Sequence, residues 1–241
     1  MLKKIQLEQF ISGVSIAIGL SIGGYFIGQT MYNAKVALNT AEVKGLAERR
    51  VEADQANWKI NFRVRGSSKS EIPGLYKKSE KIQTMIIELL KKNGFEDSEI
   101  ETGVIDYKTK EFRDENQKLV DQKYQMKGSV IVESKKVKIV SKVRSSLNKL
   151  IAQGIDIENT SPIYRFTSLN KIKPQMLSEA TKNARIAANE FAANAGVSVG
   201  GIRSARQGNF IIRDAGERYG DTEKIEKDVR VVTTITFYLT D

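Results

Sequence analysis

The strongest concentration of charge able to act on a partner is a basic run near the middle of the chain. The sequence holds no acid between Lys135 and Ile151, and apolar residues recur through this stretch at helical spacing. The pattern predicts a helix over residues 134–153 with a strongly basic face, suited to anionic lipid, glycolipid or an acidic partner. A solvated face that aids solubility would show the same pattern. The basic residues are Lys135, Lys136, Lys138, Lys142, Arg144 and Lys149.

The amino-acid composition excludes several kinds of catalytic and metal-binding site. The chain contains no histidine and no cysteine, so it has no imidazole base, no zinc site of the Cys/His type and no disulfide. Acidic residues cluster at 96–101 and 221–228, but neither cluster has the spacing of a calcium loop, and we interpret both as surface turns. We expect no enzyme activity, no catalytic, cofactor-binding or metal-binding residues, and no cofactor.

Nucleic acid is not an expected partner either. The net charge of +10, from 39 Lys and Arg against 29 Asp and Glu, would suit phosphate contacts. Aromatic residues make up only 7% of the chain and do not interleave with the basic run, which argues against a stacking platform for bases.

An uncharged segment near the N-terminus has the length of a membrane span. Residues 10–28 carry no charged side chain, and nineteen helical residues extend roughly 28 Å, close to the thickness of a bilayer core. A cleaved signal peptide is the alternative, but no clear small-x-small site follows Gly28. We predict an uncleaved anchor over residues 10–28, after a cytoplasmic segment 1–9 and before a linker 29–41.

The charges beside this segment set the expected orientation. Lys3 and Lys4 precede the span, which favours a cytoplasmic N-terminus by the positive-inside rule. Glu8 lies before the span and Lys35 after it, which reduces the excess of positive charge on the N-terminal side of the span. We predict a single-pass protein of the inner membrane with its C-terminal domain in the periplasm.

Small residues recur within the span at four-residue spacing. This spacing places them on helix faces where a neighbouring helix can approach closely, which favours self-association of the anchor. The general frequency of glycine in membrane helices explains the same pattern. The residues are Ser15, Gly19 and Gly23 on one face and Gly24 and Gly28 on another.

Residues 42–241 alternate between strand and helix patterns without a long linker. Their order, β-β-α-β-β-α-β-α-β-β, predicts an α+β fold of antiparallel sheets and three helices with a ferredoxin-like split β-α-β portion, preceded by one transmembrane helix. One extended domain and two closely packed lobes both fit this order, and residues 170–173 are the one candidate for an internal boundary. Strands are predicted at 43–48, 56–65, 101–110, 124–132, 155–167, 199–212 and 229–239, and helices at 72–90, 134–153 and 174–195, the last opened by Pro174.

A charged loop over residues 214–227 joins the last two predicted strands. Its length and charge fit exposed recognition, so we predict a subunit contact at Arg213, Asp214, Arg218 and Tyr219. A flexible hairpin without a partner fits the sequence equally well.

Three stretches resemble the SIMPL-domain family. They are the opening VKGLAERRVEAD of residues 43–54, the alanine-rich helix and glycines of residues 178–201, and the closing VRVVTTITF of residues 229–237. The likeness covers residues 42–240 in the family's order, although many relatives have Gly at the position of Ala47 and Pro at that of Ala53. The resemblance implies a bacterial envelope protein without established catalytic residues. Some relatives assemble into large rings, and others are connected with oxidative-stress tolerance.

We therefore expect a membrane-anchored extracytoplasmic protein that acts through homo-oligomeric assembly in the cell envelope, as a ring or a smaller oligomer. Its partners would be copies of itself and the lipid bilayer around residues 10–28. The alternative is a binding module for anionic lipid, glycolipid or an acidic envelope partner through the basic helix 135–150.

Overall fold

The computed structural model describes residues 2–36, 39–158 and 160–240, and side chains in the first helix from Ser12 to Ala34. The chain divides into two compact units. Unit 1 comprises Met1–Ala47, Pro174–Phe210 and Val231–Asp241, and unit 2 comprises Glu48–Lys173 and Ile211–Arg230. One boundary falls at the end of the predicted segment 170–173. The other boundaries lie within or beside strands, where the sequence gives no linker signal.

The N-terminal helix α1 (Leu2–Val36) continues well past the predicted end of the span at Gly28. Within it, Ser12–Ala34 is long and apolar enough to cross a membrane, with a mean hydropathy of 1.3. The side chains of residues 10 and 11, and those of Lys3, Lys4, Glu8 and Lys35 that set the expected orientation, lie outside the described residues.

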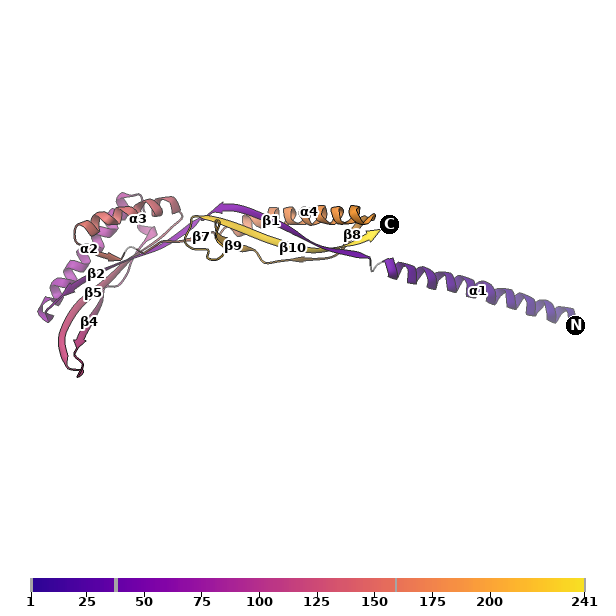
Figure 1. Cartoon of the computed structure of the whole chain (residues 1–241), viewed down its shortest axis with the longest axis horizontal. Helices are drawn as coiled ribbons and strands as arrows, with labels where there is room; N and C mark the ends of the chain where they lie inside the picture. The colour runs from indigo at the N-terminus through magenta and orange to yellow at the C-terminus, as the bar shows by residue number, and fades with distance from the viewer. Residues whose placement is uncertain (1, 37–38, 159, 241) are drawn as a thin grey trace. The chain divides into compact units, whose positions relative to one another are not determined.

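Unit 1 holds a sheet covered by one helix. Its strands come from β1 (Thr40–Glu52), β10 (Glu226–Thr240) and β8 (Ser198–Gln207), with β10 between the other two, and the short β9 (Ile211–Asp214) of unit 2 also pairs with β10. Helix α4 (Leu169–Ala195) lies along β1, β8 and β10 (Figure 1). Alternate residues of β10 are buried, including Val231, Ile235 and Phe237.

Close packing of α4 on β1 depends on small side chains. The helix buries Ala180, Ala184 and Ala188. A Cβ atom added at Gly45 would lie 1.9 Å from the carbonyl oxygen of Ala180 and 2.6 Å from the amide nitrogen of Ala184. The alanine-rich sequence predicts this close approach through an apolar stripe of Leu177, Ala180, Ala184, Ala187, Ala188 and Phe191. The stripe is partly wrong, because Ala187 and Phe191 are exposed, whereas Met176 and Ala192 are buried.

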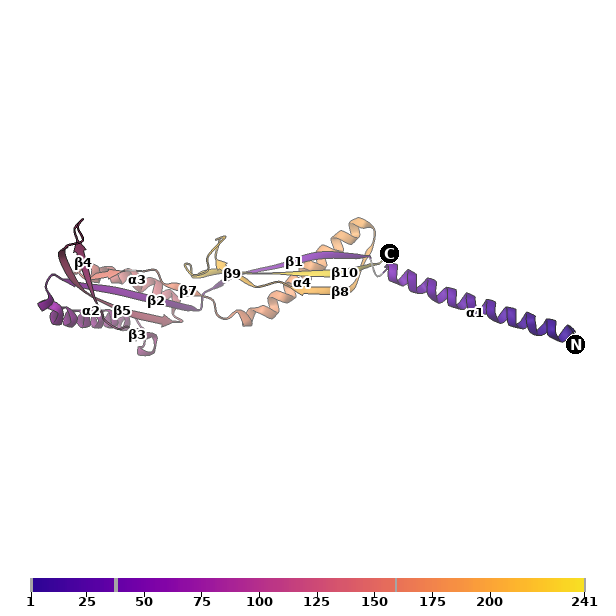
Figure 2. The ribbon, with the colours of Figure 1, turned by 90° about the horizontal axis from the view of Figure 1, so that it is seen from below.

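Unit 2 is built on the long antiparallel pair β2 (Gln55–Gly66) and β5 (Leu119–Ser134), in register from Ala56 opposite Ser134 to Gly66 opposite Tyr124. Helices α2 (Ile72–Lys92) and α3 (Val137–Ala152) lie beside these strands (Figure 2). The two short 3₁₀ turns are η1 (Lys69–Glu71) and η2 (Asp97–Glu99), and the remaining strands are β3 (Ile100–Thr102), β4 (Asp106–Arg113), β6 (Asp156–Glu158) and β7 (Ile163–Arg165).

The strand order of unit 2 confirms the split β-α-β prediction. Strands β6 and β7 pair with β2, β2 pairs with β5, and β5 pairs with β3 and β4. The even-numbered residues of β2, from Ala56 to Val64, are buried against both helices. Trp58 is fully buried and donates its indole N–H to the carbonyl of Thr160 at 2.9 Å. The α+β class with antiparallel sheets is therefore confirmed.

Several predicted strands are interrupted. The segment 101–110 divides into β3 and β4 around Gly103, whose amide donates to the carbonyl of Ser129 at 2.9 Å. Pro162, which cannot donate a ladder hydrogen bond, lies between β6 and β7 within the predicted segment 155–167. The segment 199–212 divides into β8 and β9 after Gly208, where a Cβ atom would lie 2.5 Å from the carbonyl oxygen of Val232.

The predicted start of the last helix is also wrong. Helix α4 begins at Leu169 and contains Pro174. The reason is a distant carboxylate: Asp54 accepts hydrogen bonds from the backbone amides of Thr167 at 2.7 Å and Ser168 at 2.9 Å. These bonds fix the chain directly before Leu169, so the helix starts five residues ahead of the proline.

Candidate interaction site

The acidic clusters do not form a metal site within the described residues. In the first cluster, Glu96 and Glu99 form a capping box around η2 and both contact the ammonium of Lys136, at 3.2 and 2.7 Å. Burial acts to raise the pKa of Glu99, but hydrogen bonds from Lys136 and Ser134 outweigh it and hold the pKa below its ordinary value. This cluster therefore serves to fix the chain ahead of α3.

The structure separates the six basic residues of the predicted helix into two groups. Lys136 lies before the first turn of α3 and forms ion pairs with Glu96 and Glu99. Lys138 contacts Glu52 at 2.8 Å. Arg144 is half-buried near Tyr164. Burial raises the pKa of the Tyr164 phenol and outweighs a hydrogen bond with Ser141 and the charge of Arg144, which both act to lower that pKa. These three basic residues have roles inside the chain.

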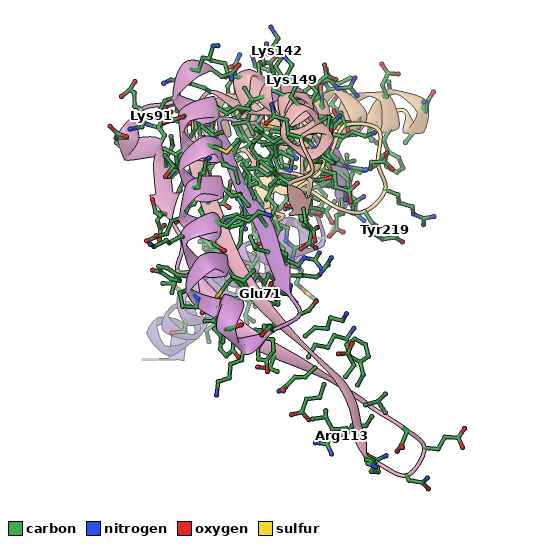
Figure 3. The ribbon with its side chains drawn as sticks, turned by 90° about the vertical axis from the view of Figure 1, so that its left-hand side faces the viewer. Glu71, Lys91, Arg113, Lys142, Lys149 and Tyr219 are labelled. Atoms are coloured by element: carbon green, nitrogen blue, oxygen red, sulfur yellow. The ribbon has the colours of Figure 1, made fainter. Side chains whose placement is uncertain are left out.

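Lys135, Lys142 and Lys149 form the second group. All three are exposed, and no ion pair to them occurs among the described residues. Lys142 and Lys149, seven positions apart, lie on the same side of α3 (Figure 3). The basic face available to a partner is thus narrower than the sequence predicts.

The loop between β9 and β10 is fixed at its base by a buried ion pair. The ammonium of Lys227 is fully buried against the carboxylate of Asp214 and donates to the carbonyl of Asp221 at 2.8 Å. Asp214 also accepts the backbone N–H of Glu223 at 2.8 Å. Burial acts to raise the pKa of Asp214, and the hydrogen bonds from Lys227 and from the backbone outweigh it, so this pKa is lowered.

These contacts correct the expectation for the loop. Asp214 is buried and holds the loop in place, so its side chain is not exposed to a second subunit, and Arg213 is half-buried on β9. Arg218 and Tyr219 are exposed, with the guanidinium 5.6 Å from the centre of the Tyr219 ring. The exposed part of the loop is therefore its tip.

The small residues of α1 remain open on the helix surface. A Cβ atom added at Gly19, Gly23, Gly24 or Gly28 would meet nothing within 4 Å. Ser15 lies on the same exposed helix. The glycine positions therefore leave room for a neighbouring helix to approach.

Sequence reasoning missed a third surface, the arm formed by β4 and the start of β5. Every residue of β4 is exposed, and in the described part of the chain β4 pairs only with β5. The arm nevertheless carries apolar side chains, namely Tyr107, Phe112, Leu119 and Val120, the last 68% exposed. The sequence signal was present, because Phe112, Leu119 and Val120 flank the polar stretch 113–118. Arg113, the last residue of β4, lies near the tip of the arm in Figure 3.

The turn of this arm is well defined. The carboxylate of Asp114 accepts the backbone amides of Asn116 and Lys118, both at 2.9 Å, and Gln117 adopts a positive φ of 63°. Arg113 donates to Glu111 at 2.7 Å and to the carbonyl of Gln117 at 3.0 Å. The arm therefore presents a fixed shape with exposed apolar side chains and strand edges that no other strand of the described residues covers.

Residues 41–237 match the family model SIMPL, described as a protein of unknown function (DUF541). The match includes segments of both units and leaves out all of α1. A comparison with the curated proteins finds no match.

Proposed function

The chain belongs to the SIMPL family, and on this premise we propose that it is a membrane-tethered envelope protein that acts by assembling with copies of itself. The observation that carries the proposal is the β4–β5 arm. An isolated two-stranded hairpin is marginally stable in water, and apolar residues on both of its strands gain most when a second chain covers them.

Unpaired strand edges support the same proposal. Within the described residues β1 and β8 each pair only with β10, so the outer edges of this sheet have no strand partner. Exposed apolar residues also lie in unit 1, with Ile186 at 58% and Ile202 at 52%. Free edges of this kind invite pairing with another chain unless they are covered, and assembly covers them.

The test of assembly is the mass of full-length protein in a mild detergent, measured by sedimentation over a range of concentrations. We expect a discrete oligomer, and we expect Phe112→Ser with Val120→Ser to reduce it to smaller species without loss of fold. Tyr76→Ser with Ile151→Ser is the matched control, since both residues are exposed apolar side chains of unit 2 outside the arm. A monomer at every concentration would contradict the proposal.

The anchor and its orientation form part of this proposal. The support is the helix Ser12–Ala34, which has the length and hydropathy of a membrane span or of a signal sequence. We expect the N-terminus in the cytoplasm and both units in the periplasm, where assembly would serve tolerance of envelope or oxidative stress. We expect the intact mass of the purified protein to include residue 1. We also expect protease to digest both units when it is added on the periplasmic side, and not when it is added on the cytoplasmic side. A product beginning near Lys35 would show a cleaved signal.

A second candidate is binding of anionic lipid by the exposed basic residues of α3. It is favoured by Lys142 and Lys149, which share one side of the helix and carry no ion pair among the described residues. Full-length protein in phosphatidylcholine nanodiscs should bind phosphatidylglycerol vesicles at low salt and release them at high salt, because salt screens the attraction. Lys142→Gln with Lys149→Gln should abolish this binding, and equal binding to neutral vesicles would contradict it.

A further inference from the structure

A basic hollow lies in unit 2, away from the arm. It has a volume of about 440 Å³ and is formed by the end of β2, the exposed side of α2 and the turn between α3 and β6. This volume lies within the range of small-molecule sites, about 300–1,000 Å³. The charged residues that line it are Arg63, Arg65, Lys78, Lys81 and Asp156.

The charges of the hollow do not balance. Arg65 contacts Asp156 at 3.0 Å, and Arg63 reaches Glu158 at 3.5 Å. Lys78 and Lys81, three positions apart on α2 and so on one side of the helix, have no ion pair with any residue of the described ranges. Two positive charges are therefore left without an acid, enough to balance a dianion.

The rest of the wall is apolar. Val64 and Ile82 are buried, and Met85 and Ile155 are half-buried, so their side chains form a hydrocarbon surface beside the cationic groups. Inorganic phosphate alone would leave this apolar surface in contact with water. An anion that carries an apolar group would satisfy both parts of the hollow.

We propose that this hollow binds a phosphate monoester with an apolar substituent. The dianionic phosphate pairs with Lys78 and Lys81, and the substituent packs on Met85 and Ile155. The phosphate can belong to a soluble metabolite or to a lipid headgroup, because the recognition chemistry is the same. The site is separate from the exposed lysines of α3 and adds a ligand to a protein whose proposed action is assembly.

The test uses full-length protein in phosphatidylcholine nanodiscs and titration calorimetry with phenyl phosphate. We expect saturable binding of phenyl phosphate. The double substitution Lys78→Gln with Lys81→Gln should lower the affinity at least about tenfold, the scale of one lost charge-assisted hydrogen bond. The matched control is Lys77→Gln with Lys92→Gln, which removes the same charge from α2 outside the hollow and should change the affinity less than about twofold. Unchanged thermal unfolding of both variants shows that the fold is retained.

Three results would overturn the proposal: no binding of phenyl phosphate, equal weakening by both pairs of substitutions, or inorganic phosphate binding as tightly as phenyl phosphate. Phenol alone should not bind. Competition by vesicles that contain phosphatidic acid would identify a lipid as the source of the ligand. Lack of competition, with phenyl phosphate still bound, would identify a soluble phosphate monoester.

Discussion

Unit 2 fills its core with large side chains, whereas unit 1 packs alanines against backbone. The core of unit 2 includes Trp58, Phe62, Ile86 and Leu147, all with less than 2% of their surface exposed. The smaller core cluster of unit 1 is Ala184, Ala188, Ile235 and Phe237. Buried apolar area stabilises a fold in proportion to its size, so unit 2 has the larger reserve, and unit 1 depends on close fit.

The two units also differ in charge. The carboxyl groups whose pKa is lowered, those of Asp54, Glu99, Asp214 and Asp228, all belong to unit 2. Unit 2 is therefore held by ionised groups as well as by apolar packing. From this difference we expect a single substitution or a change of pH to unfold one unit before the other. The following experiments test whether the two units unfold separately.

The largest effect is expected from removing the buried ammonium of unit 2. Lys227→Met leaves the carboxylate of Asp214 buried without its cation, which should cost about 3–5 kcal/mol of unfolding free energy. Urea unfolding followed by the fluorescence of Trp58, the one tryptophan of the chain, measures the loss in unit 2. Lys224→Met is the control, because its ion pair with Glu217 is about half exposed and should contribute less than about 1 kcal/mol.

In unit 1 the corresponding test is Gly45→Ala. The added methyl group would overlap the backbone of α4 at Ala180, so we expect a loss of about 3 kcal/mol from overpacking. Hydrogen exchange in α4 and β10 should accelerate while Trp58 fluorescence stays unchanged. Gly74→Ala serves as the control, since nothing lies within 4 Å of its added Cβ. Simultaneous loss of protection in both units would break the comparison.

Acid should act on unit 2 first. A carboxyl whose pKa is lower in the folded than in the unfolded chain stabilises the fold above its ordinary pKa, and this contribution is lost as the pH falls through the folded value. Below about pH 4 we expect Trp58 fluorescence to report unfolding before α4 loses helicity. Burial acts to raise the pKa of Asp54 and the hydrogen bonds from Ser168 and Thr167 outweigh it, so Asp54→Asn should make the acid transition shallower.

The smallest effect concerns a buried amide in unit 2. The side chain of Gln83 donates to the carbonyls of Gly103 at 2.7 Å and Ser129 at 3.0 Å. Gln83→Leu leaves both carbonyls without this donor and should cost about 1–3 kcal/mol, measured by urea unfolding. Thr84→Ala, at an exposed position on the same helix, should change stability by less than about 0.5 kcal/mol. A neutral Gln83→Leu would mean that water replaces the amide.

Much of the fold could be predicted because its signals are local. The alternation from Ala56 to Val64 predicts β2, and the alanines of residues 180–188 predict a closely packed helix. The early start of α4 could not be predicted, because it depends on Asp54, which is 113 residues from Thr167 in the sequence. Local periodicity carries no information about such a partner.

The candidate surfaces were harder to predict for the same reason. Lys136 and Lys138 look equivalent to Lys142 in the sequence, yet the first two meet acids from other elements. Asp214 and Lys227 look like ordinary ends of a charged loop, and their burial becomes visible only when the loop is folded. The hollow beside Arg63 joins three separate segments, so no spacing in the sequence indicates it.

The position of β10 has a consequence for how the protein is made. This strand lies between β1 and β8 in the sheet but follows both along the chain. On the ribosome, two outer strands and an alanine-rich helix emerge before the strand that joins them. A nascent chain arrested at that stage exposes unpaired backbone on both strands, which makes it a substrate for chaperones and proteases.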